Sequence, residues 1–319
     1  MISVLPERPK SQHALHDPAR AWPETNCYVD LWIEVLHALD LDPIACFGFT
    51  FSTDFEGDQW TFFKPTFADI WELYGVDIQE LNIWRSVLDH LREQIPRKRF
   101  VLVEVDSFYL PDLVATDYRK AHAKTTIAVD SLDEENKRLG YFHNAVYHQL
   151  EGDDYKALLE TPPLLPPYTE YAKIDRVVKR SPDELRKLAR GYLARELARR
   201  PGKNPIGEFR ARFATDAAWL AEKDLAQFHA YAFATLRQLG ACFELASTHL
   251  KWLAPDDELH VKAAGHFEEI SNGAKALLFK VARMVGGNKK KQSFDETLAT
   301  MESAWAAGME TLAAHYSKS

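Results

Sequence analysis

A chain of 319 residues with 46% hydrophobic and 27% charged residues has the composition of a globular protein with one large or two ordinary domains. Its net charge of −8 disfavours nonspecific nucleic-acid binding, because the phosphate backbone attracts basic surfaces. Three cysteines without a close pair exclude a disulfide framework and a CxxC zinc or redox site, and they predict a reducing compartment.

The first residues do not combine a basic start with an apolar run, so we expect no signal peptide. No stretch reaches the about 20 consecutive apolar residues of a membrane-spanning helix. We therefore expect a cytoplasmic protein that binds no membrane, no nucleic acid, no metal and no cofactor of its own.

The first part of the chain predicts an arm and then an α+β domain. Residues 1–24 are rich in Pro and His without periodicity and are expected to form the arm. A helical pattern follows, with Asn26 as its N-cap and Cys27 in its first turn. Further along, the patterns predict strands at 44–52 and 58–65, a short helix at 67–75, a strand or strand-to-helix segment at 76–84 and a helix at 86–94.

Three later segments predict a meander of antiparallel strands at 100–106, 122–130 and 139–147. Residues 25–160 therefore read as one α+β domain. Four prolines within 162–168 predict a semi-rigid linker over 161–180. Residues 181–319 are rich in Ala, Leu, Glu, Lys and Arg, and they predict an all-α bundle with helices near 181–200, 206–221, 224–253, 257–285 and 293–316, with an exposed break at 286–291.

Cys27 is a candidate nucleophile because the unpaired amides of a helix N-terminus favour a thiolate. His122, which begins a predicted strand, is the candidate base, and Asn144, one hairpin further on, could fix its tautomer. Asp106 and Asp130 end strands and could orient the base instead. The structural alternatives are a buried cysteine at position 27 and a strand-edge residue at position 122.

His143 is a second candidate base, although a histidine inside a strand is more often packed in the core. The acidic turn at 54–60 contains Gln59, which could donate an N–H to a developing oxyanion.

The runs NCYVD, DFEGDQWTFFKP, EVDSFYLPD, TDYRKAHAKTTIAV and LGYFHNAVY resemble a bacterial family, the domain of unknown function 1839. Members of that family are associated with amino acid:carrier-protein ligases, which load amino acids onto a phosphopantetheine arm. The resemblance is close over residues 20–160 and looser to the C-terminus. It implies an acyl or aminoacyl carrier protein, or its ligase, as the partner.

A weaker resemblance is to the papain-like acyltransferases of the butirosin biosynthesis protein H type. Their pattern has a Cys that opens a helix, a strand ending in Asp before Tyr-Leu-Pro, and a His that opens the next strand. Cys27, Asp106 with Tyr109, and His122 match it, whereas Asn144 stands where that family has Asp. The resemblance implies a papain-like fold with a helical C-terminal domain.

Together the site pattern and the two resemblances imply a cysteine-dependent transferase that moves an acyl or aminoacyl group from a carrier-protein thioester to an amine. Its catalytic residues would be Cys27, His122 and Asn144. The expected substrate-binding residues are Gln59, Trp60, Asp106, Tyr109 and His143. A non-catalytic partner of the loaded carrier protein and a thioesterase or peptidase-like hydrolase are the competing hypotheses.

A basic segment could serve either hypothesis. Residues 171–212 hold thirteen Lys or Arg against five Asp or Glu, so the rest of the chain carries about −16. This segment could dock an acidic carrier protein, or it could be the solvated face of a helix.

Overall fold

The computed structural model describes residues 1–9, 11–161, 163, 165–287 and 293–316, and these form two compact units. The sheet unit comprises Met1–Asp17, Asn26–Pro43 and Thr66–Ser181. The helical unit comprises Pro18–Thr25, Ile44–Pro65 and Pro182–Ser319. Neither unit is one continuous stretch of chain, because the chain passes between them after residues 17, 25, 43, 65 and 181. Two of these positions coincide with boundaries expected from composition, near 25 and 180, whereas residue 160 lies inside the sheet unit.

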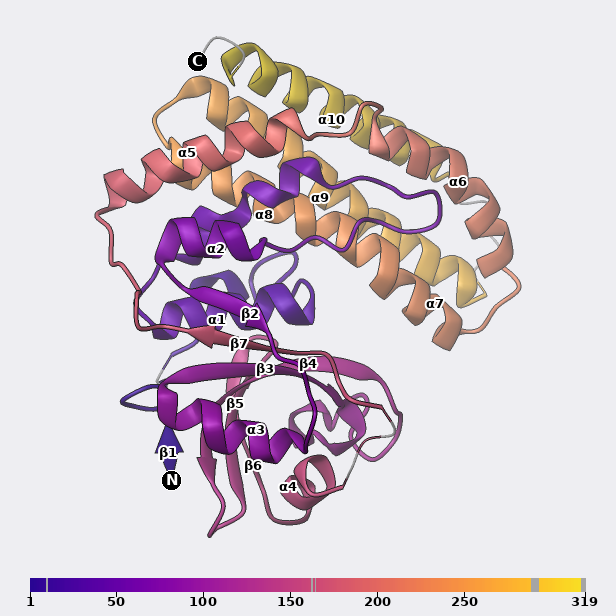
Figure 1. Cartoon of the computed structure of the whole chain (residues 1–319). Coiled ribbons are helices and arrows are strands. Elements are labelled where there is room, and N and C mark those ends of the chain that lie inside the picture. The colour runs from indigo at the N-terminus through magenta and orange to yellow at the C-terminus, as the bar shows by residue number, and fades with distance from the viewer. Residues whose placement is uncertain (10, 162, 164, 288–292, 317–319) are drawn as a thin grey trace. The chain divides into compact units, whose positions relative to one another are not determined.

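The sheet unit is built on an antiparallel sheet of seven strands in the order β2-β7-β3-β4-β5-β6, with β1 paired to β4 (Figure 1). The strands are β1 (Ile2–Ser3), β2 (Asp77–Glu80), β3 (Arg99–Asp106), β4 (Lys124–Asp133), β5 (Arg138–His143), β6 (Val146–Glu151) and β7 (Thr169–Lys173). The helices of this unit are α1 (Cys27–Ala38), α2 (Phe67–Tyr74), α3 (Val87–Gln94) and α4 (Gly152–Leu159), with single turns η1 (Ala14–His16), η3 (Ile95–Arg97), η4 (Ser107–Tyr109) and η5 (Pro111–Leu113). The predicted antiparallel meander is confirmed in β3, β4 and β5. However, β4 begins at Lys124 and not at residue 122, and the third predicted strand, 139–147, includes the turn between β5 and β6.

The two faces of the sheet differ in what covers them. Side chains alternate along a strand, so Leu102 and Val105 of β3 point to opposite faces. Tyr28 of α1 donates a hydrogen bond of 2.8 Å to Glu170 of β7, which is the Cα partner of Leu102. Helix α1 therefore covers the Leu102 face, and Val105 with its partner Thr125 belongs to the other. Figure 1 shows α1 and α3 on opposite sides of β3.

The N-terminal arm is fastened to α1 by a buried histidine. His16 places Nδ1 2.6 Å from Glu34 Oε1 and Nε2 3.4 Å from Asp30 Oδ1, and it is 3% exposed. Burial alone would lower the pKa of His16, but hydrogen bonds to Asp30 and Glu34 and their negative charge outweigh it and raise the pKa to about 9. The predicted arm therefore packs on the sheet unit at His16, and residues 1–17 belong to that unit, whereas residues 18–25 belong to the helical unit.

The predicted linker contains a structural strand. β7 lies between β2 and β3, inside the sheet, and Ala172 is fully buried. Prolines at 163, 166 and 167 stop short of β7, so they end the preceding segment without removing ladder donors from the strand. Residues 162 and 164 of this stretch lie outside the described residues.

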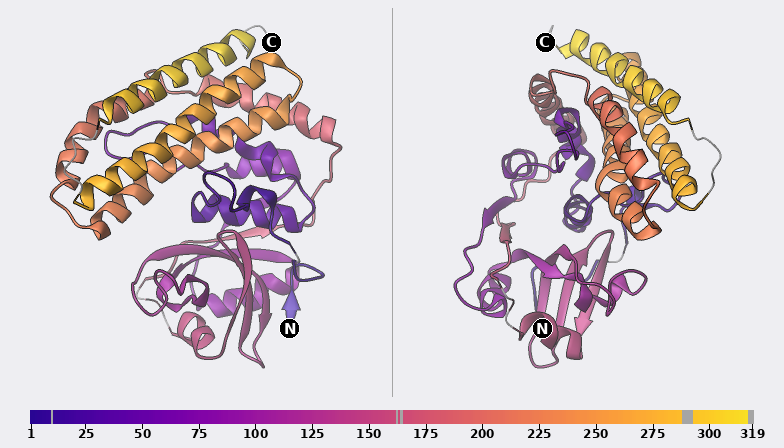
Figure 2. Two further views of the ribbon diagram at one scale, coloured as in Figure 1. Left: turned by 180° about the vertical axis from the view of Figure 1, so that it is seen from behind. Right: turned by 90° about the vertical axis from the view of Figure 1, so that its right-hand side faces the viewer.

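The helical unit contains α5 (Pro182–Ala198), α6 (Pro205–Leu220), α7 (Leu225–Ala232), α8 (Gln238–Leu253), α9 (Glu258–Val285) and α10 (Asp295–Tyr316), with a π-turn (Phe233–Arg237) joining α7 to α8. Figure 2 shows α8, α9 and α10 side by side. The five predicted helical segments are confirmed. The predicted break at 286–291 falls mostly on residues 288–292, outside the described part of the chain.

The predicted strand at 44–52 is wrong. Pro43–Ser52 forms the 3-10 helix η2, whose hydroxyls bond back three residues: Thr50 to the Phe47 carbonyl and Ser52 to the Phe49 carbonyl. Phe51 packs edge-on against Phe267 at 5.3 Å in the helical unit. Aromatic residues that suggest a strand are here the core of a bundle. The second predicted strand is reduced to one bridge between Phe55 and Trp60. No helix among the described residues is long and apolar enough to cross a membrane.

Candidate active site

A histidine–aspartate pair stands where β3 ends and β4 begins. His122 Nδ1 lies 2.6 Å from Oδ2 of Asp106, the last residue of β3. The antiparallel register pairs Asp106 with Lys124. His122 lies two residues before Lys124 in the chain, and this brings its ring close to the Asp106 carboxylate. A carboxylate at Nδ1 favours the tautomer with its proton there, which leaves the Nε2 lone pair able to accept a proton.

Phe108 fixes the plane of this imidazole. Its ring stacks on His122 with centroids 4.3 Å apart and an angle of 9°. Asp106 Oδ1 accepts the Phe108 N–H at 3.0 Å, and the Arg119 guanidinium lies 5.6 Å from the Phe108 ring. Sequence reasoning missed Phe108, although an aromatic residue two positions after a strand-ending Asp is a usable signal.

Cys27 is the first residue of α1, as predicted, and Asn26 is the N-cap whose side chain accepts the Val29 N–H at 2.9 Å. The thiol is half-buried. The contact from Tyr28 to Glu170 places the first turn of α1 on the Leu102 face of the sheet.

Asp106 shares that face, because alternation along β3 gives it the same side as Leu102. Among the described residues, the Cys27 sulfur makes no hydrogen bond to His122.

No hydrogen bond joins Asn144 to His122 among the described residues, and the side chain at His122 Nδ1 is that of Asp106. Asn144 lies in the two-residue turn between β5 and β6 with a φ of 49°, a left-handed backbone that Asn tolerates better than most residues. Asp130, the other alternative, is buried and accepts hydrogen bonds from the Leu5 N–H and the Tyr147 hydroxyl. Burial raises the pKa of Asp130 despite these hydrogen bonds.

His143 is a packed core residue on the other face of the sheet. Its Nδ1 lies 2.5 Å from Asp112 Oδ2 and its Nε2 lies 2.8 Å from the hydroxyl of Thr125, and it is 1% exposed. Tyr141 donates to the second oxygen of Asp112 at 2.5 Å. Burial favours the neutral acid, but the hydrogen bond from His143 and its charge outweigh it and lower the pKa of Asp112. With both ring nitrogens occupied, His143 has no free nitrogen for a substrate.

We expect His143→Gln to lower stability by about 1–3 kcal/mol, because it disturbs buried hydrogen bonds, and to leave catalysis nearly unchanged. Urea unfolding and transfer assays on the same preparation would measure both. A loss of turnover larger than that of His122→Ala would make His143 the base.

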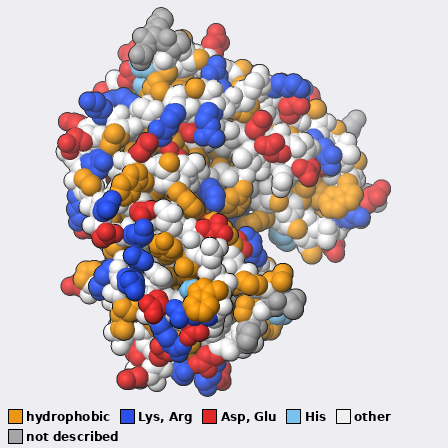
Figure 3. All heavy atoms as spheres, in the orientation of Figure 1, with side chains coloured by type: hydrophobic (Ala, Val, Ile, Leu, Met, Phe, Trp, Pro, Cys, Tyr) orange, Lys and Arg blue, Asp and Glu red, His pale blue; other side chains and the backbone are white. Residues whose placement is uncertain are grey.

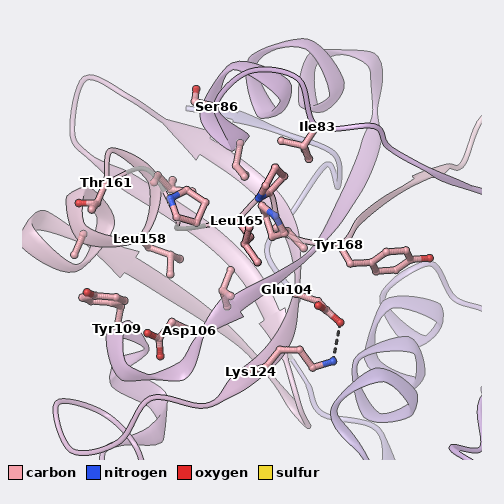
Figure 4. Close-up of a pocket in the computed structure, with 18 of the residues that line it drawn as sticks. Ile83, Ser86, Glu104, Asp106, Tyr109, Lys124, Leu158, Thr161, Leu165 and Tyr168 are labelled. Carbon is pink, nitrogen blue, oxygen red and sulfur yellow. Dashed lines mark hydrogen bonds and ion pairs between the residues drawn. The ribbon is translucent and has the colours of Figure 1, made fainter.

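A cavity of about 1020 Å³ adjoins the pair (Figure 4). Asp106, Tyr109 and His122 line it, as do residues before and at the start of α3, at the end of α4 and before β7. Three of the predicted site residues are therefore brought together here.

Gln59 and Trp60 belong to the helical unit and not to the unit that holds this cavity. Trp60 is buried against Phe55 and Phe209, with ring centroids 5.2 and 5.5 Å away. Gln59 is exposed, and its carbonyl accepts the Glu56 N–H in a turn. Trp60 thus has a packing role that its position in an acidic turn did not indicate.

The basic segment is largely neutralised within the fold. Lys173 pairs with Asp77, Lys179 with Asp40, Arg199 with Glu196, Arg210 with Asp295 and Arg212 with Asp216. Other guanidiniums of the segment donate to carbonyls, namely those of Arg180, Arg186, Arg190 and Arg200. Figure 3 shows basic and acidic side chains interspersed over the visible face. The geometry favours the solvated-face interpretation of this segment.

Comparison with known proteins finds no match among curated proteins. The chain does match the DUF1839 N-terminal domain over residues 11–174 and the DUF1839 C-terminal domain over residues 182–314. The chain therefore belongs to the DUF1839 family, a family of unknown function.

Proposed function

We propose that this protein is a cysteine-dependent acyltransferase whose site is formed by Cys27, His122 and Asp106. The observation that carries the proposal is the 2.6 Å His122–Asp106 contact beside a large cavity, with Nε2 unoccupied by any described residue. A cysteine at the start of a helix that packs on the same antiparallel sheet is the arrangement of papain-like enzymes, which supports that relationship.

In the proposed reaction, the Cys27 thiol gives its proton to His122 Nε2, and the thiolate attacks the carbonyl carbon of a thioester. The carrier thiolate leaves and takes the proton from the imidazolium. An amine then attacks the Cys27 acyl-thioester and gives a proton to His122, and Cys27 departs as the thiolate. Asp106 stabilises the imidazolium in both halves. The proposed donor is a phosphopantetheine thioester on a carrier protein.

Thiol reactivity tests the nucleophile. Cys27 should react with iodoacetamide at pH 6, because an imidazolium stabilises a thiolate, whereas an unassisted cysteine reacts as the pH approaches ~8.5. Peptide mass spectrometry would follow all three cysteines. Cys242 is an internal control, since burial raises the pKa of its thiol to about 12.

His122→Ala should abolish the reaction of Cys27 at pH 6 and leave Cys242 unchanged. In the unaltered protein, incubation with an acyl thioester should add the mass of the acyl group to the Cys27 peptide. Full transfer activity in Cys27→Ala would contradict the proposal and favour a non-catalytic partner.

A further inference from the structure

The cavity beside His122 combines a cluster of charged side chains with a larger apolar part. The ends of β3 and β4 contribute the charged residues Glu104, Asp106, His122 and Lys124, and β3 also contributes the apolar Val103 and Val105. Across from them lie apolar side chains from three other segments: Ile83 and Val87, Leu158, and Leu165. Figure 4 shows Ile83, Leu158 and Leu165 on the side away from Lys124. A ligand with one polar end and an apolar body matches this division.

The charged groups that line the cavity have opposite charges beside them. Lys124 lies 2.7 Å from Glu104, and His122 lies 2.6 Å from Asp106. The two remaining charged residues pair outside the lining: Arg85 lies 3.9 Å from Glu93, and Glu160 lies 2.5 Å from Lys137. A substrate ammonium or carboxylate would therefore have to compete with an existing ion pair. An uncharged group meets no such cost.

We infer that the cavity receives an uncharged, apolar acyl chain of medium length, with its carbonyl toward His122. This inference rests on the proposed function for the orientation of the acyl group, and it narrows the donor from acyl or aminoacyl to apolar acyl. An aminoacyl group would bring an α-ammonium into a lining whose carboxylates are already paired.

Binding of unreactive analogues tests the inference without catalysis. Thioethers of N-acetylcysteamine with hexyl, octyl and decyl chains would be titrated into the whole protein by calorimetry. Burial of each methylene is worth ~0.8 kcal/mol, so each should lower Kd about three- to fourfold. The decyl compound should then bind on the order of a hundredfold more tightly than the hexyl compound. Cys27→Ala should show the same series, because the thiol is not needed for binding.

Leu158→Asp should weaken decyl binding at least tenfold, because it places a charge in the apolar wall. Leu188→Asp in α5 is the matched control, since Leu188 is 39% exposed and outside the cavity. Ile83→Asn is a second variant for the wall, and thermal unfolding would show that each variant is folded.

Equal affinity across the three chain lengths, or equal loss in Leu158→Asp and Leu188→Asp, would overturn the inference. A different result would be binding of the thioethers that depends on chain length, together with no acylation of Cys27 by an acyl thioester. That result would refute the proposed function, but the inferred class of ligand would remain supported.

Discussion

Replacing His122 by alanine should lower the rate of acyl transfer by two to four orders of magnitude, about the contribution of a positioned general base. Asp106→Asn should cost less, roughly 10- to 100-fold, because it removes a charge-assisted hydrogen bond worth ~1.5–3 kcal/mol but keeps the imidazole in place. Single-turnover acylation of Cys27 by a soluble thioester is the measurement.

The variant Asn144→Gly decides whether Asn144 or Asp106 orients the base, His122. Glycine accepts the left-handed φ of 49° at this turn, so the fold should persist. The rate should match that of the unaltered protein. If Asn144→Gly were as slow as His122→Ala while Asp106→Asn retained full activity, the assignment of Asp106 would be wrong.

Replacing His16 by glutamine should destabilise the sheet unit by about 3–5 kcal/mol, because it leaves Asp30 and Glu34 as buried carboxylates without their cation. The pKa of His16 is raised from 6.5 to about 9 by folding. A raised pKa means that the folded state binds the proton more tightly, so this stabilisation is complete below pH 6.5. The stabilisation disappears as the pH rises through 9, and its full contribution to the free energy of unfolding is on the order of 3 kcal/mol.

Urea unfolding at pH 6, 8 and 10 would measure this effect as a difference between the unaltered protein and His16→Gln. The difference should shrink as the pH rises. His229→Gln is the control, because His229 is an exposed residue of α7. The double variant His16→Gln, Glu34→Gln should recover part of the stability by removing one unpaired charge. A difference that grows from pH 6 to pH 10 would contradict the role given to His16.

Features that depend on local patterns could be predicted from the sequence alone. Asn26 and Cys27 mark a helix start because a capping side chain acts within three residues. The strand at 99–106 is a long apolar run in a central position, and the helices after 181 are long amphipathic patterns. Asp106 could be nominated because it ends β3, and His122 because it lies two residues before β4.

Features set by distant parts of the chain were not predictable in the same way. The residues 44–52 have strand-forming side chains, but their partners lie on helices far later in the chain, such as the helix that carries Glu196 and the one that carries Phe267. The choice between Asp106 and Asn144 depended on the register of β3 against β4, which no single segment encodes. His16 was overlooked because its partners lie on the other side of a loop.

The two units also share the chain in an interleaved manner. Residues 44–65 belong to the helical unit, yet they are synthesised before β2 to β7, and β7 is made only after the prolines of residues 163–167. During translation, residues 44–65 have no helical partners until α5 to α10 have been synthesised. The sheet lacks its inner strand β7 until residue 173 has been synthesised. A fragment that ends at residue 160 would therefore lack β7, and a fragment that begins after residue 180 would lack residues 44–65 of the helical unit. The C-terminal domain recognised in this family is for that reason a poor candidate for exchange between proteins as a separate module.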